Sequence, residues 1–260
     1  MKKDSQFKEY AAFYDLLYKD KDYAGEATYI DQLMGKFLKK KKSDVQLLDL
    51  ACGTGKHLRE LRGMGYGKLF GSDISGSMIE VAKKASKGND IQFFNLSFQH
   101  ACKINRKFDV ITSMFSAVNY ITTYEDQSKT LKNIHDLLLP GGLFIFDFWN
   151  GNAVVRDYSP VKILRKNHGD AEIMRISETT LDVINQGVTV KFTCSYFEGS
   201  KRKLEFVETH NLHYYFFSEI RNLLVSHHFD IVHTSPFMHL KKDLSPSDWN
   251  ISIIARKKDI

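Results

Sequence analysis

The sequence contains few cysteines and lacks a long apolar run. Its three cysteines, Cys52, Cys102 and Cys194, are odd in number and widely spaced, and they include no CxxC pair. This usage fits a reducing compartment and argues against a disulfide framework or a structural zinc site. No apolar stretch approaches the roughly 20 residues of a membrane-spanning helix, and no apolar segment of a secretory signal follows the start MKKDSQFKEY. We therefore expect a cytoplasmic protein that binds no metal.

The excess of positive charge is small. The 260 residues include 37 Lys and Arg against 31 Asp and Glu, which gives a net charge of +6. Such a balance can suit a nucleic acid or an anionic small substrate. Much of the excess lies in runs such as Lys39–Lys42 and Lys257–Lys258, which are typical of solvated helix ends and tails. A nucleic-acid partner is not expected from charge alone.

Short apolar runs alternate with amphipathic stretches between Val45 and Trp149. This pattern predicts strands at 45–50, 68–74, 91–96, 107–115 and 141–149, and helices at 56–65, 75–86 and 125–139. Continuous apolar strands that alternate with helices form parallel sheets with helices on both faces. With two further strands near the C-terminus, the sequence predicts an α/β fold with a Rossmann-like, doubly wound, seven-stranded sheet.

Longer strands are predicted after Trp149. Turn residues near 185–187 and 198–200 divide the segment 160–214 into three or four strands, and a helix at 217–229 precedes strands at 230–237 and 249–257. We expect 160–214 to be an antiparallel insertion on the substrate side of a core formed by 45–159 and 215–260. A homodimer paired through this block is compatible with the sequence but is not required by it.

The N-terminal segment 1–44 is helical in period and rich in Tyr and Phe. One interpretation is a helical lid over the ligand site, with the stretch KDKDYAG as a break between two helical pieces. The other interpretation is ordinary packing of a helix against the core, and the sequence leaves both open.

The segment VQLLDLACGTGKH at 45–57 places Gly53 and Gly55 directly after the first predicted strand. A dinucleotide-binding loop needs a third glycine at the position of Leu58, and a P-loop needs Ser or Thr at the position of His57. Both phosphate-binding hypotheses therefore fail on spacing. What remains is a loop whose glycines let the backbone lie against an uncharged, bulky edge of a ligand.

Two carboxylates accompany this loop. Asp73 ends the second predicted strand, where a carboxylate can accept two hydrogen bonds from a ribose diol. Capping of the helix at 75–87 is the alternative role for Asp73. Asp49 lies inside an apolar strand, where an isolated buried charge would be costly. We expect it to accept hydrogen bonds from the loop amides or from an ammonium group of the ligand.

Four stretches of the chain resemble class I S-adenosylmethionine-dependent methyltransferases in order and spacing: LLDLACGTGKHLREL, GSDISGSMIEVAKK, FDVITSMFSAVNYI and LLLPGGLFIFDFW. The aromatic start FYDLLYKDKDYAGEA and the antiparallel block after the fifth strand resemble the amino-sugar N-methyltransferase subgroup. The resemblance implies S-adenosylmethionine as the cofactor. It also implies a small-molecule methyl acceptor, such as the amine of an amino sugar.

The resemblance implies contacts with the methionine half of the cofactor. Ala51, Gly53 and Gly55 would lie behind the methionine moiety, with Asp49 near its amino group. The Met114 carbonyl would accept a hydrogen bond from the ammonium group of the cofactor. Tyr14 and Tyr23 would close over the carboxylate of its methionine half.

At the other end of the cofactor, Asp73 would hold the ribose diol while Ile74 and Met78 pack against the adenine. The family often has an acid after the third strand that accepts from the adenine amino group. This sequence has Ser97 there, which could accept the same bond more weakly, with the Phe98 amide binding a ring nitrogen.

On the acceptor side, Tyr120 stands where the amino-sugar subgroup has a histidine after the fourth strand. A tyrosine can hydrogen-bond an acceptor but is a poor base near neutral pH. Tyr14 and Tyr120 are the catalytic candidates, and Asn119 and Trp149 are the substrate-side candidates. Packing in the pocket wall is the alternative role for each of these residues.

The sequence leaves two other functions open. An RNA or protein methyltransferase would suit the positive charge, but the stretch after the fourth strand, SMFSAVNY, lacks an Asn/Asp-Pro-Pro-Tyr motif. A non-catalytic protein that binds S-adenosylmethionine is the second alternative, because Ser97 and Tyr120 both depart from the family pattern.

Overall fold

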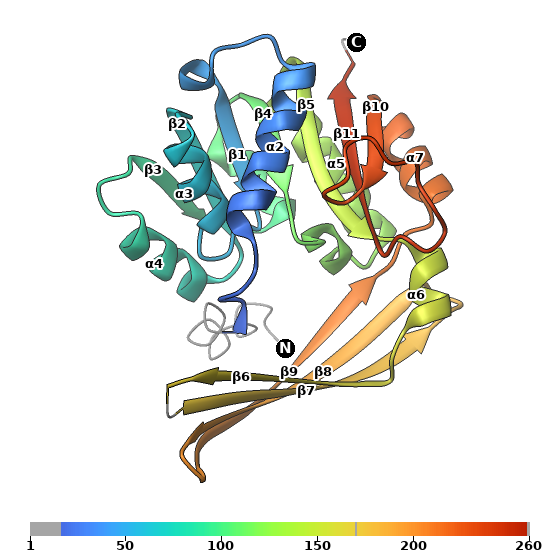
Figure 1. Cartoon of the computed structure of the whole chain (residues 1–260). Coiled ribbons are helices and arrows are strands. Elements are labelled where there is room, and N and C mark those ends of the chain that lie inside the picture. The colour runs from blue at the N-terminus through green and yellow to red at the C-terminus, as the bar shows by residue number, and fades with distance from the viewer. Residues whose placement is uncertain (1–16, 170, 259–260) are drawn as a thin grey trace.

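The computed structural model describes residues 17–169 and 171–258. These residues form a seven-stranded sheet and a four-stranded sheet. Figure 1 shows the four-stranded sheet as a long, twisted layer across one end of the seven-stranded core. No helix in the described part of the chain combines the length and the apolar content needed to cross a membrane.

The seven-stranded sheet has the strand order β10-β11-β5-β4-β1-β2-β3. Its members are β1 (Gln46–Leu50), β2 (Lys68–Asp73), β3 (Ile91–Asn95), β4 (Phe108–Ser113), β5 (Leu138–Trp149), β10 (Phe229–Pro236) and β11 (Asn250–Lys257). Strands β1 to β5 pair in parallel, and β11 pairs antiparallel with both β5 and β10. The chain order reverses between β1 and β4, which is where doubly wound sheets bind ligands. The predicted fold class is confirmed.

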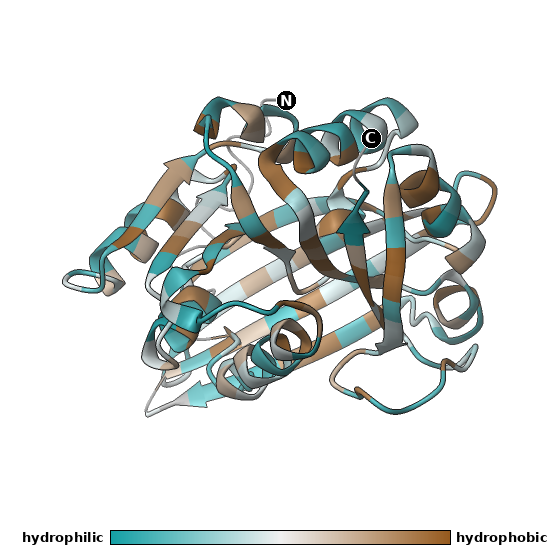
Figure 2. Ribbon diagram, turned by 90° about the horizontal axis from the view of Figure 1, so that it is seen from above, coloured by the Kyte–Doolittle hydropathy of each residue, from teal (hydrophilic) through white to brown (hydrophobic). Residues whose placement is uncertain are grey.

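Helices cover both faces of this sheet (Figure 1). On one face lie α2 (Tyr23–Phe37), α3 (Lys56–Gly63) and α4 (Gly76–Ala85), and on the other lie α5 (Tyr124–Leu137) and α7 (Phe217–Ser226). Successive strand residues point to opposite faces, so Leu47 packs beneath α2 while Leu48 packs with the α5 side. Figure 2 shows the resulting concentration of apolar residues on the core strands.

The four-stranded sheet is inserted between β5 and α7. It comprises β6 (Val161–His168), β7 (Ala171–Asp182), β8 (Gly187–Glu198) and β9 (Lys201–His213), all antiparallel. The chain enters through α6 (Gly151–Asp157), a seven-residue helix that the apolar pattern did not predict, and its cap residue Asn150 accepts from the Asn152 amide. It returns at Tyr215, whose amide donates to the Trp149 carbonyl at 3.1 Å.

The described part of the N-terminal segment contacts both sheets. Ala27, Ile30 and Leu33 of α2 are fully buried against the core sheet. Leu17 lies instead in a cluster with Ile173 and other apolar residues of the inserted sheet. For α2, ordinary packing accounts for the helical pattern. The remainder of the predicted lid, residues 1–16, lies outside the described residues.

Gly71 of β2 allows α3 to pack closely on the sheet. A Cβ atom there would lie 2.8 Å from side-chain atoms of Cys52, Leu58 and Phe93. We expect Gly71→Ala to lower the free energy of unfolding by about 1–3 kcal/mol through overpacking. Gly35→Ala is the matched control, because a Cβ there meets nothing within 4 Å in the exposed interior of α2. It should raise stability by about 0.5–1 kcal/mol. Urea unfolding of both variants tests this, and equal effects would contradict the account.

Candidate active site

The ends of β1, β2 and β4 meet the inserted sheet at one edge of the core. Two hydrogen bonds join the layers here: the Tyr120 hydroxyl lies 2.9 Å from His210 Nδ1, and the Asn119 amide donates to the His213 carbonyl at 2.7 Å. Both bonds come from η4 (Ala117–Tyr120), a short 3₁₀ helix after β4. Figure 1 shows this edge of the core above the inserted sheet.

The glycine loop after β1 turns sharply. Ala51, Gly53 and Gly55 all have positive φ, at 60°, 54° and 74°. This conformation is available to glycine without strain, and a Cβ at Gly55 would also lie 3.0 Å from the Phe93 ring. The loop is therefore a backbone surface without bulky side chains at its two glycines, as the sequence predicts for a ligand-facing turn.

Asp73 ties this loop to the end of β2. Its Oδ2 accepts from the Gly53 amide at 2.9 Å, and its Oδ1 accepts from the Ser75 amide at 2.8 Å. Ser75, not Asp73, is the cap residue of α4, because its hydroxyl accepts from the Met78 amide. Burial raises the pKa of Asp73, although the two amides oppose the shift. Each carboxylate oxygen keeps a second lone pair, so the group suits a ribose diol.

Asp49 is buried on β1, with 2% of its surface exposed. The Thr112 hydroxyl on the neighbouring strand β4 donates to its Oδ1 at 2.8 Å. The predicted bonds from the loop amides are therefore replaced by a cross-strand bond. Burial raises the pKa of Asp49 to about 6, while the charge of His57 and the Thr112 bond lower it. A buried carboxylate of this kind favours a cationic partner.

A charged cluster joins the start of α2 to the start of α3. His57 Nε2 lies 2.6 Å from Glu26 Oε2, and Glu26 also pairs with Lys21. Burial opposes ionisation of Glu26, but the bonds and charges of His57 and Lys21 lower its pKa below the usual value. The ammonium groups of Lys21 and Lys56 lie 4.4 and 4.8 Å from the centre of the Tyr23 ring. This positive environment around Tyr23 suits a carboxylate.

Sequence reasoning missed Lys21, Glu26 and His57 as members of the site. His57 was used to exclude a P-loop, and its place in the glycine motif was the one signal that could have indicated a binding role. Glu26 lies 31 residues earlier in the chain. The pairing depends on how α2 packs on α3, which a single sequence does not specify.

The residues predicted for the adenine end lie in the segments that follow β2 and β3: Ile74 comes after β2, and Met78 lies in α4. Met78 is buried and Ile74 is half-buried. Asn95 donates to the carbonyls of Asp73 and Ile74 at 2.9 and 2.8 Å, a positioning role that the sequence did not suggest.

Ser97 and Phe98, the other adenine candidates, start the 3₁₀ helix η3 (Phe98–Ile104). The Ser97 hydroxyl lies 2.9 Å from His100 Nδ1. The half-buried Phe98 packs against the core on the α5 side. Their contacts with an adenine stay predictions.

The turn after β4 is held in a strained form by Asp147. Phe115 and Ser116 both have positive φ, at 62° and 54°, which costs of the order of 1–3 kcal/mol for each such residue. The Ser116 amide and hydroxyl both donate to Asp147 Oδ2, at 2.9 and 2.8 Å. This turn follows the buried Met114 and leaves the Phe115 ring 40% exposed, 5.2 Å from the Tyr18 ring.

The remaining candidates lie nearer the inserted sheet or beyond the described residues. Asn119 is fully buried, with its oxygen accepting from the Trp149 amide at 3.3 Å, and this burial disfavours its predicted contact with an acceptor. Trp149 is half-buried and contacts the Trp249 ring edge-on at 5.8 Å. Tyr14 lies outside the described residues, so its predicted role stays a prediction.

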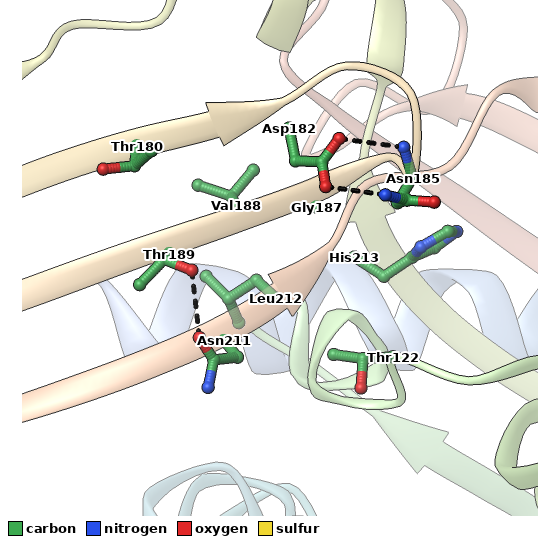
Figure 3. Close-up of a pocket in the computed structure, with 10 residues that line it drawn as sticks. All are labelled: Thr122, Thr180, Asp182, Asn185, Gly187, Val188, Thr189, Asn211, Leu212 and His213. Carbon is green, nitrogen blue, oxygen red and sulfur yellow. Dashed lines mark hydrogen bonds between the residues drawn. The ribbon is translucent and has the colours of Figure 1, made fainter.

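A pocket lies at the end of the inserted sheet where β9 returns to the core (Figure 3). The carboxylate of Asp182 in this pocket accepts from the amide groups of Asn185, and Thr189 donates to Asn211 at 3.0 Å. None of the predicted cofactor residues lines it. Among the described residues, no group of three His, Cys, Asp or Glu side chains could hold a metal ion.

The raised pKa of Asp49 makes its ionisation costly in the folded protein. The folded pKa of about 6 lies above the ordinary aspartate value of 3.8, so ionisation destabilises the fold as pH rises through this interval. Above it, Asp49→Asn should raise the free energy of unfolding by up to about 3 kcal/mol.

Urea unfolding at pH 4 and pH 8, without added ligand, measures this effect. The difference between Asp49→Asn and the parent protein should be small at pH 4 and largest at pH 8. Asp44→Asn, at an exposed site, should show no such pH dependence. A variant less stable than the parent at pH 8 would contradict the account.

The chain is similar to known methyltransferases. Residues 47–142 match a family described as a methyltransferase domain. The dTDP-4-amino-2,3,4,6-tetradeoxy-D-glucose N,N-dimethyltransferase of Saccharopolyspora spinosa is 29% identical over 206 residues, which cover 76% of this chain and 77% of that protein. The dTDP-3-amino-3,4,6-trideoxy-alpha-D-glucopyranose N,N-dimethyltransferase of Streptomyces venezuelae is 32% identical over 143 residues, 54% of this chain and 57% of that protein.

The fold is also that of a solved methyltransferase. The crystal structure of an S-adenosylmethionine-dependent methyltransferase from Clostridium acetobutylicum superposes with a TM-score of 0.80 at 21% identity and covers 97% of this chain and 99% of that one. The superposition includes the inserted sheet, because it extends over nearly the whole chain. Together with the glycine loop, these findings show that residues 47–142 match a methyltransferase domain and that the chain has the fold of a solved S-adenosylmethionine-dependent methyltransferase.

Proposed function

We propose that this chain transfers the methyl group of S-adenosylmethionine to the amine of a small molecule, an amino sugar on a nucleotide carrier. The observation that carries this proposal is the position of the inserted sheet, whose His210 side chain and His213 carbonyl bond to η4 after β4. The two named relatives act on dTDP-linked amino sugars.

The structure supports a specific placement of the cofactor. We propose that Asp73 holds the ribose diol, while Asp49 attracts the methionine ammonium and the Met114 carbonyl accepts from it. Tyr23, flanked by Lys21 and Lys56, would lie at the methionine carboxylate. Tyr14 would close this end, as the family resemblance implies, and Ile74, Met78, Ser97 and Phe98 would surround the adenine.

The cofactor supplies a methyl group on a positively charged sulfur, which the acceptor nitrogen displaces in line. The chain contributes mainly by holding the two groups close and aligned, an effect worth up to about 7–11 kcal/mol. The rings of Phe115 and Tyr18 lie edge to face beside this space and can stabilise a transferring cation. The acceptor must present an unprotonated amine, so a proton has to leave before attack.

We also propose the division of the chain into a lid at 1–44, a core at 45–159 and 215–260, and a substrate-side insertion at 160–214. The insertion would close the acceptor side, where Trp149 packs at its root. The free cysteines Cys52 and Cys194 are buried and Cys102 is exposed, which suits a cytoplasmic location. A homodimer through the insertion is compatible with this division.

Calorimetry with S-adenosylmethionine tests the cofactor site. We expect saturable binding that Asp73→Ala weakens by about 100-fold or more, because two charge-assisted hydrogen bonds to the ribose are lost. Asp182→Ala is the matched control, since this exposed carboxylate belongs to the pocket of Figure 3. It should bind like the parent protein. Equal affinities for all three proteins would contradict the assignment of Asp73.

Transfer of labelled methyl groups tests the acceptor class. The protein is incubated with methyl-labelled S-adenosylmethionine and, separately, dTDP-linked amino sugars, simple amines and total RNA. We expect label on the amino-sugar nitrogen. Label in RNA alone would replace the proposed acceptor by a nucleic acid, and binding of the cofactor without any transfer would favour a non-catalytic protein.

A further inference from the structure

The buried His210 and the half-buried Tyr120 form a hydrogen-bonded pair between the inserted sheet and the core. The Tyr120 hydroxyl lies 2.9 Å from His210 Nδ1, and the two rings meet edge to face at 5.8 Å. On the other side of the imidazole, Nε2 lies 3.3 Å from a carboxylate oxygen of Glu208. His210 is 1% exposed. The three side chains therefore form a chain from hydroxyl to imidazole to carboxylate.

The strand pairing explains this alignment. Glu208 and His210 are two residues apart on β9, so both point to the same face of the inserted sheet. Phe192 pairs with Glu208 across the ladder, and its ring lies 4.7 Å from the His210 ring. The same face of β7 carries Arg175, which donates to the Tyr18 hydroxyl at 2.9 Å and lies over the Phe192 ring. This face is the one that meets the core.

This series of three side chains ends at Tyr120, on the η4 helix that follows β4 of the core. Burial is the main reason that the pKa of Tyr120 is raised. The charges of Tyr18, Glu208 and Asp73 raise this pKa further. The charge of Arg175 lowers it. From η4, the Tyr120 hydroxyl reaches His210 of the inserted sheet.

We propose that His210 is the proton acceptor for the acceptor amine and acts through the Tyr120 hydroxyl; this proposal rests on the proposed function. An N–H bond of the substrate ammonium breaks and its proton bonds to the Tyr120 oxygen, while the proton of the Tyr120 hydroxyl moves to His210 Nδ1. The freed nitrogen lone pair forms the bond to the methyl carbon, and the electron pair of the carbon–sulfur bond stays on sulfur. The imidazolium formed is stabilised by Glu208.

In this arrangement Tyr120 does not have to act as the base itself, which a tyrosine does poorly near neutral pH. Tyr120 need not carry a negative charge, because it gains one proton as it loses another. Nδ1 must be unprotonated to accept from the hydroxyl, which places the neutral imidazole proton on Nε2, facing Glu208. A histidine from β9 thus takes the task that the subgroup resemblance assigns to a histidine after the fourth strand.

The pH profile of methyl transfer distinguishes proton acceptance from mere support of Tyr120. His210→Asn keeps an oxygen that can accept from the Tyr120 hydroxyl but cannot take a proton. With a dTDP-linked amino sugar as the probe, we expect kcat to fall by about 100-fold or more near neutral pH. The loss should shrink as pH rises and the substrate amine loses its proton in solution. Tyr120→Phe should behave in the same way.

The exposed His239 provides the control, since His239→Asn should keep the parent profile. Affinity for S-adenosylmethionine should change less than about threefold in all three variants, which would show that the cofactor site is intact. A loss of kcat that is equal at every pH would assign His210 a purely structural role and overturn the proposal. Parent-like kcat in His210→Asn would overturn it as well.

A second measurement needs no acceptor. In protein labelled with ¹⁵N-histidine, NMR should show the neutral His210 ring with its proton on Nε2, and Tyr120→Phe should shift the Nδ1 resonance. A proton on Nδ1 would reverse the direction of the bond and overturn the proposal. Absence of methyl transfer by the parent protein to every amino sugar would instead refute the proposed acceptor, so the two failures are distinguishable.

Discussion

The hydrogen bond from the Gly53 amide to the Asp73 carboxylate is the interaction on which the site depends. It joins the loop after β1 to the end of β2, two points 20 residues apart in the chain. The same carboxylate accepts from Ser75, the residue that caps α4. The loop, the strand end and the helix start are therefore held together by one side chain, which still has lone pairs for a ribose.

Three buried carboxylates at this edge of the core lower the stability of the ligand-free protein when they are ionised. Burial raises the pKa of Asp49, Asp73 and Asp147, which means that each ionised group costs the fold free energy in the absence of a ligand. Asp73 and Asp147 recover part of this cost through backbone amides. Asp49 has the Thr112 hydroxyl, so a cationic ligand would stabilise it most. In the proposed site, the ionised Asp49 would lower the stability of the ligand-free protein and favour binding of a cation.

The sequence predicts the core well where the signal is local. The apolar runs and the glycine pair specify strands, and Ser75 specifies the start of α4, because these depend on neighbouring residues. The loop residues and Asp73 lie together as predicted from the strand order. The short helix α6 was missed, since seven residues carry little periodicity.

The polar pairs across elements could not be predicted in the same way. Glu26 and His57 are 31 residues apart, Ser116 and Asp147 also 31, and Tyr120 and His210 are 90 apart. Each pair depends on how a helix or the inserted sheet packs on the core. The sequence places His210 and His213 on opposite faces of a strand, but it does not indicate which face meets Tyr120.

A structure of the protein with bound S-adenosylhomocysteine tests the central claim most directly. The account predicts the ribose hydroxyls on Asp73 and the ammonium beside Asp49. It also predicts the sulfur facing the Phe115 turn and the inserted sheet. A cofactor whose ribose lies away from Asp73, or whose sulfur points away from the inserted sheet, would contradict it.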